Sequence, residues 1–175
     1  MIAVDAGLML KPQDVVILLK VLCWEGVWTY EQLALSLKTS ASVVHDSLKR
    51  CEVSHLYNRQ HRQVMREALL EFLVHGVKYV FPATVGNLKR GIPTAHSAEL
   101  LKDLLMVSES IPYVWAFARG KVKGQEIKPL YKQLPESIGD DRRFYEILCL
   151  VDVLRIGKVR EQELAIAALK ERLYE

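Results

Sequence analysis

Cysteine is scarce in this sequence, and a long apolar run is missing. The three cysteines, Cys23, Cys51 and Cys149, are scattered and odd in number, so we expect free core thiols in a reducing cytoplasm rather than disulfides. The longest apolar stretch, residues 15–24, is interrupted by Lys20 and is too short to span a bilayer. The first residues lack a basic segment and a cleavage site. We therefore expect no signal peptide and no membrane partner.

Catalytic motifs are missing as well. The sequence contains no phosphate-binding loop, no glycine fingerprint for a dinucleotide and no His/Cys spacing typical of a metal site. His96 and Ser97 are neighbours, and neighbours on a strand point to opposite faces, so they would not form a nucleophile–base pair. We therefore expect neither an enzyme nor a cofactor nor a bound metal.

What the sequence does contain is an uneven distribution of charge. Half of its 175 residues are apolar and 26% are charged, which is typical of a globular protein. The net charge of +3 is concentrated: residues 38–90 carry nine Lys/Arg against four Asp/Glu, and residues 119–132 carry five basic residues against Glu126. Local excess of this kind is typical of nucleic-acid binding, and scattered solvated lysines are the alternative.

Residues 29–51 (TYEQLALSLKTSASVVHDSLKRC) have the pattern of two helices joined by a tight turn. Thr29 and Gln32 can form a capping box for the first helix, and Ser40 can cap the second. The apolar positions that share a face are Leu33, Ala34 and Leu37 in the first helix and Val44, Leu48 and Cys51 in the second. The segment is thus a candidate helix-turn-helix, whose second helix would enter the DNA major groove. An ordinary αα-hairpin is the alternative.

The stretch from Leu33 to Leu48 resembles the L-A-x-x-L-x-x-S-x-S-x-V-x-x-x-L pattern of bacterial and archaeal winged-helix transcriptional regulators of the MarR/ArsR type. The resemblance implies a winged helix-turn-helix with double-stranded DNA as its partner. Lys38 stands where the family usually has glycine, so a left-handed turn there would cost about 1 kcal/mol. A weaker resemblance, to winged-helix regulators encoded beside toxin-like nucleotidyltransferases, implies a protein partner from the same operon.

The expected fold is mainly α with small β-hairpins, in the α+β class. Residues 1–97 are predicted to form a winged helix-turn-helix DNA-binding domain, and residues 98–175 a C-terminal α+β extension for dimerisation or effector binding. The first helix, from Pro12 to about Glu25, is apolar nearly all round and needs cover on two sides, from the C-terminal region or a second subunit. We therefore expect a homodimer on a pseudo-palindromic site.

The wing is expected within residues 77–97, after a helix over residues 60–75. Its two strands would be residues 77–83 and 92–97, with Lys89 and Arg90 at the tip of the basic loop between them. Further along the chain we expect a second hairpin over residues 111–117 and 122–127, helices over 141–156 and 159–174, and Tyr113, Trp115 and Tyr131 in the core rather than around a ligand.

The expected function is sequence-specific DNA binding by a transcriptional regulator, acting as a repressor in the cytoplasm. The second helix would contact base edges and the basic wing would contact phosphates. The residues expected at the DNA are Ser40, Ser42, Val43, His45, Asp46, Lys49, Arg50, Arg59, Arg62, Lys89 and Arg90. Two alternatives are a winged-helix adaptor that binds proteins instead of DNA, and a regulator that senses a small ligand through its C-terminal half.

Overall fold

Helices dominate the computed structural model, which describes residues 6–105 and 111–175. The first half contains η1 (Ala6–Leu8), α1 (Pro12–Cys23), α2 (Tyr30–Ser36), α3 (Ala41–Val53), β1 (Tyr57–Asn58), β2 (Gln63–Val64), α4 (Arg66–His75) and α5 (Val77–Val80). Then follow β3 (Val85–Pro93), η2 (Ala95–Ser97), η3 (Glu99–Leu101), α6 (Lys102–Leu105), β4 (Tyr113–Ala116), β5 (Val122–Ile127), α7 (Leu134–Ser137), α8 (Arg142–Ile156) and α9 (Val159–Tyr174). The expected α+β class is confirmed.

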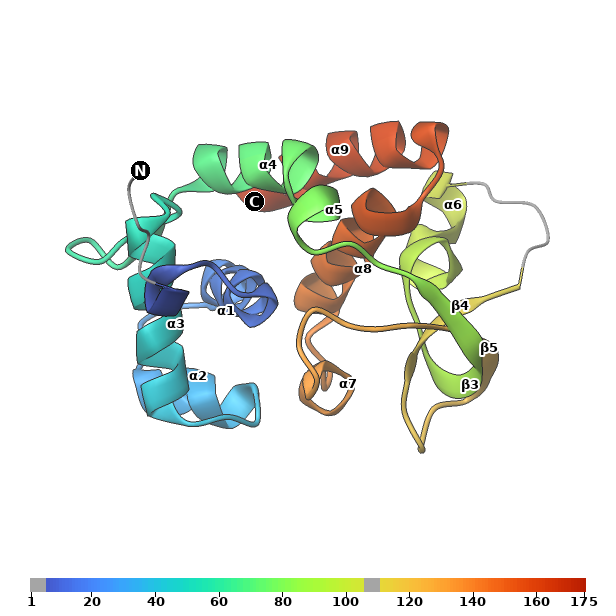
Figure 1. Cartoon of the computed structure of the whole chain (residues 1–175), viewed down its shortest axis with the longest axis horizontal. Coiled ribbons are helices and arrows are strands. Elements are labelled where there is room, and N and C mark those ends of the chain that lie inside the picture. Colours follow the sequence, from blue (N-terminus) through green and yellow to red (C-terminus); the bar gives the residue numbers. More distant parts are fainter. Residues whose placement is uncertain (1–5, 106–110) are drawn as a thin grey trace.

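The elements are arranged along one long axis (Figure 1). Helices α1, α2 and α3 lie at one end, the sheet of β3, β4 and β5 lies at the other, and α8 lies between them. Helices α4 and α9 run along one side and pack against each other. They are antiparallel: Arg66, at the start of α4, donates a hydrogen bond to the carbonyl of Leu173, at the end of α9. In the described parts of the chain, no helix is long and apolar enough to cross a membrane.

Helix α1 is buried along its length. It starts with Pro12, the Asp14 carboxylate accepts a hydrogen bond from the Lys11 N–H at 2.8 Å, and every residue from Asp14 to Cys23 is buried. Helix α3 packs on one side of α1 and α8 on another. The C-terminal region therefore covers the second apolar side of α1. The homodimer was predicted because α1 is apolar nearly all round, and burying α1 does not require a second copy of the chain.

The caps of α2 and α3 form as predicted. The Gln32 N–H donates to Thr29 Oγ1 at 3.1 Å, and the Thr29 N–H donates to Gln32 Oε1 at 2.9 Å, which completes the capping box. At the start of α3, the Val43 N–H donates to Ser40 Oγ at 3.3 Å. The two helices pack against each other, and their apolar stripes are buried.

Helix α2 ends in a Schellman motif, in which a left-handed residue lets two backbone N–H groups turn back to the helix carbonyls. The Thr39 N–H donates to the Ala34 carbonyl at 2.9 Å, and the Lys38 N–H donates to the Leu35 carbonyl at 3.3 Å. Lys38 has φ of 56°, in the region that favours glycine. A left-handed turn is therefore present at Lys38, where the family that the sequence resembles usually has glycine.

The wing predicted over residues 77–97 is wrong. Val77 is fully buried, and residues 77–80 form the short helix α5 instead of a strand. Residues 85–93 form one continuous strand, so Lys89 and Arg90 lie within β3 and not at the tip of a loop. A short hairpin, β1–β2, follows α3 directly, and for that reason the helix expected from residue 60 begins only at Arg66.

The second predicted hairpin is also wrong, because β4 and β5 run parallel to each other, with Tyr113 opposite Gln125. Both pair antiparallel with β3, and the three strands close into a small barrel. Glycine permits the close backbone contacts: a Cβ at Gly91 would lie 2.0 Å from the Trp115 carbonyl oxygen. Since β3 pairs with both later strands, a domain boundary at residue 98 would cut through this sheet.

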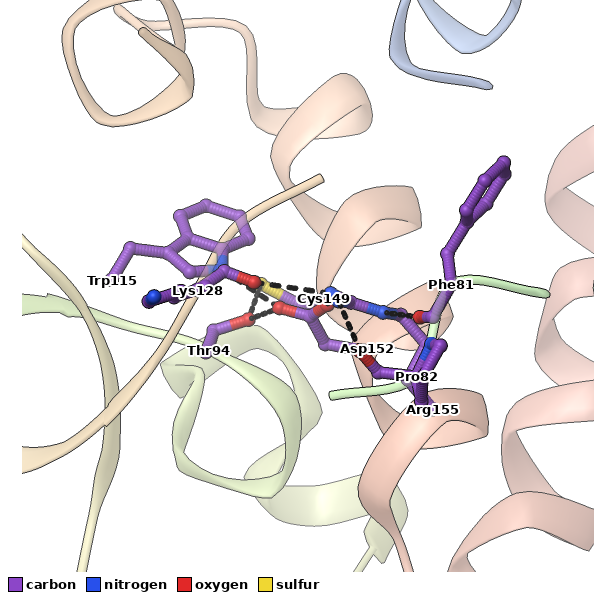
Figure 2. Close-up of polar contacts among 8 residues, drawn as sticks. All are labelled: Phe81, Pro82, Thr94, Trp115, Lys128, Cys149, Asp152 and Arg155. Carbon is purple, nitrogen blue, oxygen red and sulfur yellow. Dashed lines mark hydrogen bonds and ion pairs between the residues drawn. The ribbon is translucent and has the colours of Figure 1, made fainter. Parts of the chain in front are cut away.

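A buried polar cluster fastens this sheet to α8 (Figure 2). The Asp152 carboxylate accepts hydrogen bonds from Thr94 Oγ1 and Trp115 Nε1, each at 2.7 Å, and pairs with Arg155 at 2.7 Å. Arg155 also donates to the Phe81 carbonyl at 2.9 Å, which ties down the segment before β3. Trp115 is therefore a core residue, and Tyr113 and Tyr131 pack against the same core, as expected.

The three cysteines are free and buried, as the sequence predicts. Burial raises the pKa of Cys23 to about 11. Burial likewise raises the pKa of Cys51 and Cys149 well above the usual value for a thiol. These thiols stay protonated near neutral pH and serve as small apolar side chains.

The left-handed backbone conformation of Lys38 allows the turn between α2 and α3 to be tested directly. Lys38→Gly should raise the free energy of unfolding by up to about 1 kcal/mol, because glycine removes the steric penalty of this backbone conformation. Lys49→Gly is the matched control: Lys49 is exposed within α3, so the same change should lower stability by about 1 kcal/mol. Urea unfolding followed by circular dichroism measures both. Equal destabilisation by the two variants would contradict the turn.

Candidate nucleic-acid interface

Helix α3 has one buried and one exposed face. Val44, Leu48 and Cys51 are buried against the rest of the domain. The exposed positions are Ser42, His45, Asp46, Lys49, Glu52 and Val53. Hydroxyl, imidazole, carboxylate and ammonium groups are thus presented together, and each can form hydrogen bonds with base edges or phosphates.

A buried ion pair fixes the orientation of α3 on α1. Arg50 donates from Nε to Asp14 Oδ2 at 2.8 Å and from Nη2 to Asp14 Oδ1 at 2.7 Å. It also donates to Ser47 Oγ at 3.0 Å, which explains the hydroxyl on a mostly apolar face. The hydrogen bond with Asp14 raises the pKa of Arg50 above its usual value. Arg50 is only 6% exposed, so the prediction that it faces DNA is wrong. It lies on the buried side of α3 and binds α1 through Asp14.

The loop of the β1–β2 hairpin (residues 59–62) lies beside the exposed face of α3. Arg59 Nη2 lies 3.0 Å from His45 Nε2, and both side chains are exposed. The Asn58 side chain accepts a hydrogen bond from the His61 N–H at 3.0 Å, which stabilises the turn. The hairpin therefore brings Arg59 to the same surface as the exposed side chains of α3.

Arg62, at the end of the same loop, is held by an aromatic residue. Its guanidinium lies 4.0 Å from the centre of the Trp28 ring and donates to the Trp28 carbonyl at 2.7 Å. Arg62 has φ of 53°, a left-handed conformation that is uncommon for residues other than glycine. These contacts fix the base of the loop against the segment between α1 and α2.

Some predicted site residues lie together and others do not. One group of predicted residues lies together, and we call it the α3 surface: Ser40, Ser42, Val43, His45, Asp46, Lys49, Arg59 and Arg62. Arg50 is buried behind it, and Lys89 and Arg90 lie in β3 at the opposite end of the long axis (Figure 1). Arg59 and Arg62 are among the predicted site residues, but the hairpin that carries them was not predicted. Asn58, a turn-forming residue before a polar loop, was the available signal.

A groove of about 700 Å³ lies next to the same hairpin. Trp24, Trp28 and Tyr174 contribute aromatic side chains to its lining, and Arg62 and Arg66 contribute guanidinium groups. It lies between the end of α1, the start of α4 and the end of α9. A small ligand bound there would touch the base of the hairpin, whereas the alternative drawn from the sequence placed ligand sensing in the C-terminal half.

In comparisons with known proteins, no family model, no curated protein and no solved structure matches this chain.

The buried ion pair behind α3 provides a test of how the helix is held. Asp14→Ala should lower the free energy of unfolding by about 3–5 kcal/mol, because it leaves the Arg50 charge buried and unpaired. Replacing both partners with apolar residues, Asp14→Leu with Arg50→Met, should cost much less than the sum of the single changes. Asp46→Ala, on the exposed face, is the control and should stay within about 0.5 kcal/mol. Additive single and double effects would rule out this pairing.

Proposed function

We propose that the protein is a winged-helix DNA-binding regulator that acts as a repressor. The observation that carries the proposal is the contact between His45 and Arg59, because it joins the exposed face of α3 to a basic hairpin loop. A helix flanked by a short hairpin is the arrangement in which one element contacts base edges and the other contacts phosphates. The hairpin of β1 and β2, rather than the predicted residues 77–97, is the wing of this proposal.

Each group on the α3 surface suits a part of this task. Lys49 can donate to the acceptors of guanine, and Ser42 can donate to a base or a phosphate. Asp46 can accept from the amino group of cytosine, which would favour some sequences over others. Arg59 releases counterions from phosphates and adds affinity for any sequence. Since α1 is already covered by α3 and α8, the proposal needs no second copy of the chain.

Two variants separate base reading from phosphate contact. Lys49→Ala should cost about 1–3 kcal/mol of affinity, and unequally across operator variants, if Lys49 reads a guanine. Arg59→Ala should weaken binding to all sequences and reduce the slope of log affinity against log salt by about one unit. Fluorescence anisotropy with labelled duplexes, after selection of a preferred sequence from a random pool, measures both effects.

Lys170→Ala is the matched control, because it removes one exposed positive charge from α9, outside the α3 surface. It should leave affinity and salt slope unchanged. If Lys49→Ala and Arg59→Ala behave like this control at low salt, α3 is not at the DNA. The protein-interaction adaptor would then be the better reading, and the exposed carboxylates of Asp46 and Glu52 on α3 favour it.

Ligand sensing is a second candidate function, favoured by the groove beside the hairpin. A ligand that occupies it should raise the melting temperature and change DNA affinity, because Arg62 belongs to both the groove and the loop. Tyr174 is 53% exposed, so Tyr174→Ala should leave the melting temperature of the free protein unchanged and reduce the ligand-induced shift. A thermal-shift screen of small molecules tests this, and a shift that Tyr174→Ala leaves intact would place the ligand elsewhere.

A further inference from the structure

Two positive charges lie side by side on neighbouring strands of the barrel, at the far end of the molecule from α3. Arg90 of β3 and Lys123 of β5 are directly opposed residues in the antiparallel pairing, and both are exposed. Directly opposed residues project from the same face of a sheet, and like charges in that position destabilise it. The pair therefore weakens the sheet, and an anion bound between or over the two side chains would relieve this repulsion.

Two more basic residues adjoin this pair. Arg119 and Lys121 flank Gly120, and a Cβ at Gly120 would lie 2.3 Å from the Gly91 carbonyl oxygen. The connection from β4 to β5 therefore lies directly against β3 beside Arg90. The Phe117 N–H also donates to the Arg90 carbonyl at 3.0 Å, which holds the start of this connection in place. We call Arg90, Arg119, Lys121 and Lys123 the barrel basic face.

Acidic side chains do not neutralise this surface. Glu126 is the one carboxylate within β5, and it already forms an ion pair with Lys89, the neighbour of Arg90, at 2.8 Å. Within residues 6–105 and 111–175, no carboxylate forms an ion pair with any of the four residues of the barrel basic face. Their combined charge is thus available to an external anion.

We propose that the barrel basic face binds the phosphate backbone of a nucleic acid, separately from α3. Protein interfaces have an apolar core and are depleted in lysine, whereas this face is built from basic side chains over glycine-rich backbone. Lysine and arginine on an open surface suit the regularly spaced charges of a phosphodiester chain. The face lies at the opposite end of the long axis from α3 (Figure 1), so it is a second contact that does not rest on the proposed function.

The test uses a protein in which the α3 surface is already weakened by Lys49→Ala and Arg59→Ala. In that background, Arg90→Ala with Lys123→Ala should reduce affinity for a random-sequence duplex at least about fivefold at low salt. The slope of log affinity against log salt should fall by about two units for DNA, since each lost phosphate contact removes about 0.9. DNA and RNA duplexes are measured by anisotropy, and a loss on both assigns the contact to phosphate rather than to a base or sugar.

The matched control removes two exposed charges elsewhere, with Arg160→Ala and Lys170→Ala in α9, and should change affinity less than twofold. Arg90→Glu adds an independent readout: it should raise the melting temperature by supplying a partner for Lys123, and it should weaken binding further. Should the double variant not fold, Lys121→Ala in the connecting loop carries the same test.

The proposal fails if the salt slope is unchanged, or if polyglutamate of equal charge binds as tightly as the duplex, since an acidic protein would then be the partner. A loss caused by Arg90→Ala and Lys123→Ala supports the barrel basic face even if Lys49→Ala and Arg59→Ala had no effect of their own. Failure of this proposal and failure of the proposed function are therefore separate results.

Discussion

Complete burial of α1 is the constraint on which the rest of the structure depends. Its side chains from Val15 to Leu19 are apolar on every side of the helix, so no single neighbouring element can remove them from water. Helix α3 covers one side and α8 another, and these two helices come from opposite halves of the chain. The helix that could read DNA and the helix that carries the barrel are therefore held by the same core.

Buried charges give this core its specific geometry. Asp14 and Arg50 orient α3, Asp152 and Arg155 attach α8 to the barrel, and Lys20 reaches Asp141 at the start of α8 at 2.7 Å. Desolvation offsets much of the attraction in such pairs, so their net contribution to stability is small. Loss of one partner is costly, because it leaves the other charge buried and alone. We infer that the two pairs that join different helices, Asp14 with Arg50 and Lys20 with Asp141, serve chiefly to fix how α3 and α8 cross α1.

The two basic surfaces are kept apart by the same framework. The α3 surface lies at one end of the long axis and the barrel basic face at the other, and the antiparallel α4 and α9 run between them. The ends of these helices are joined by the contact of Arg66 with the Leu173 carbonyl. A nucleic acid bound at both ends would thus meet two contacts at a set separation. A ligand in the groove beside Arg62 would touch the α3 surface and not the barrel basic face, because no residue of that face lines the groove.

The sequence by itself determined what depends on neighbouring residues. The caps at Thr29 and Ser40, the turn at Lys38 and the exposure of Ser42, His45 and Lys49 follow from interactions within a few positions, so they could be predicted. Tertiary structure alone decided the rest. Arg50 is buried against Asp14, and this could not be predicted from the local pattern because Asp14 lies 36 positions away in the sequence. The parallel pairing of β4 with β5 and the opposition of Arg90 to Lys123 depend on strands that meet only after folding, because local pattern does not specify which distant segments will pair.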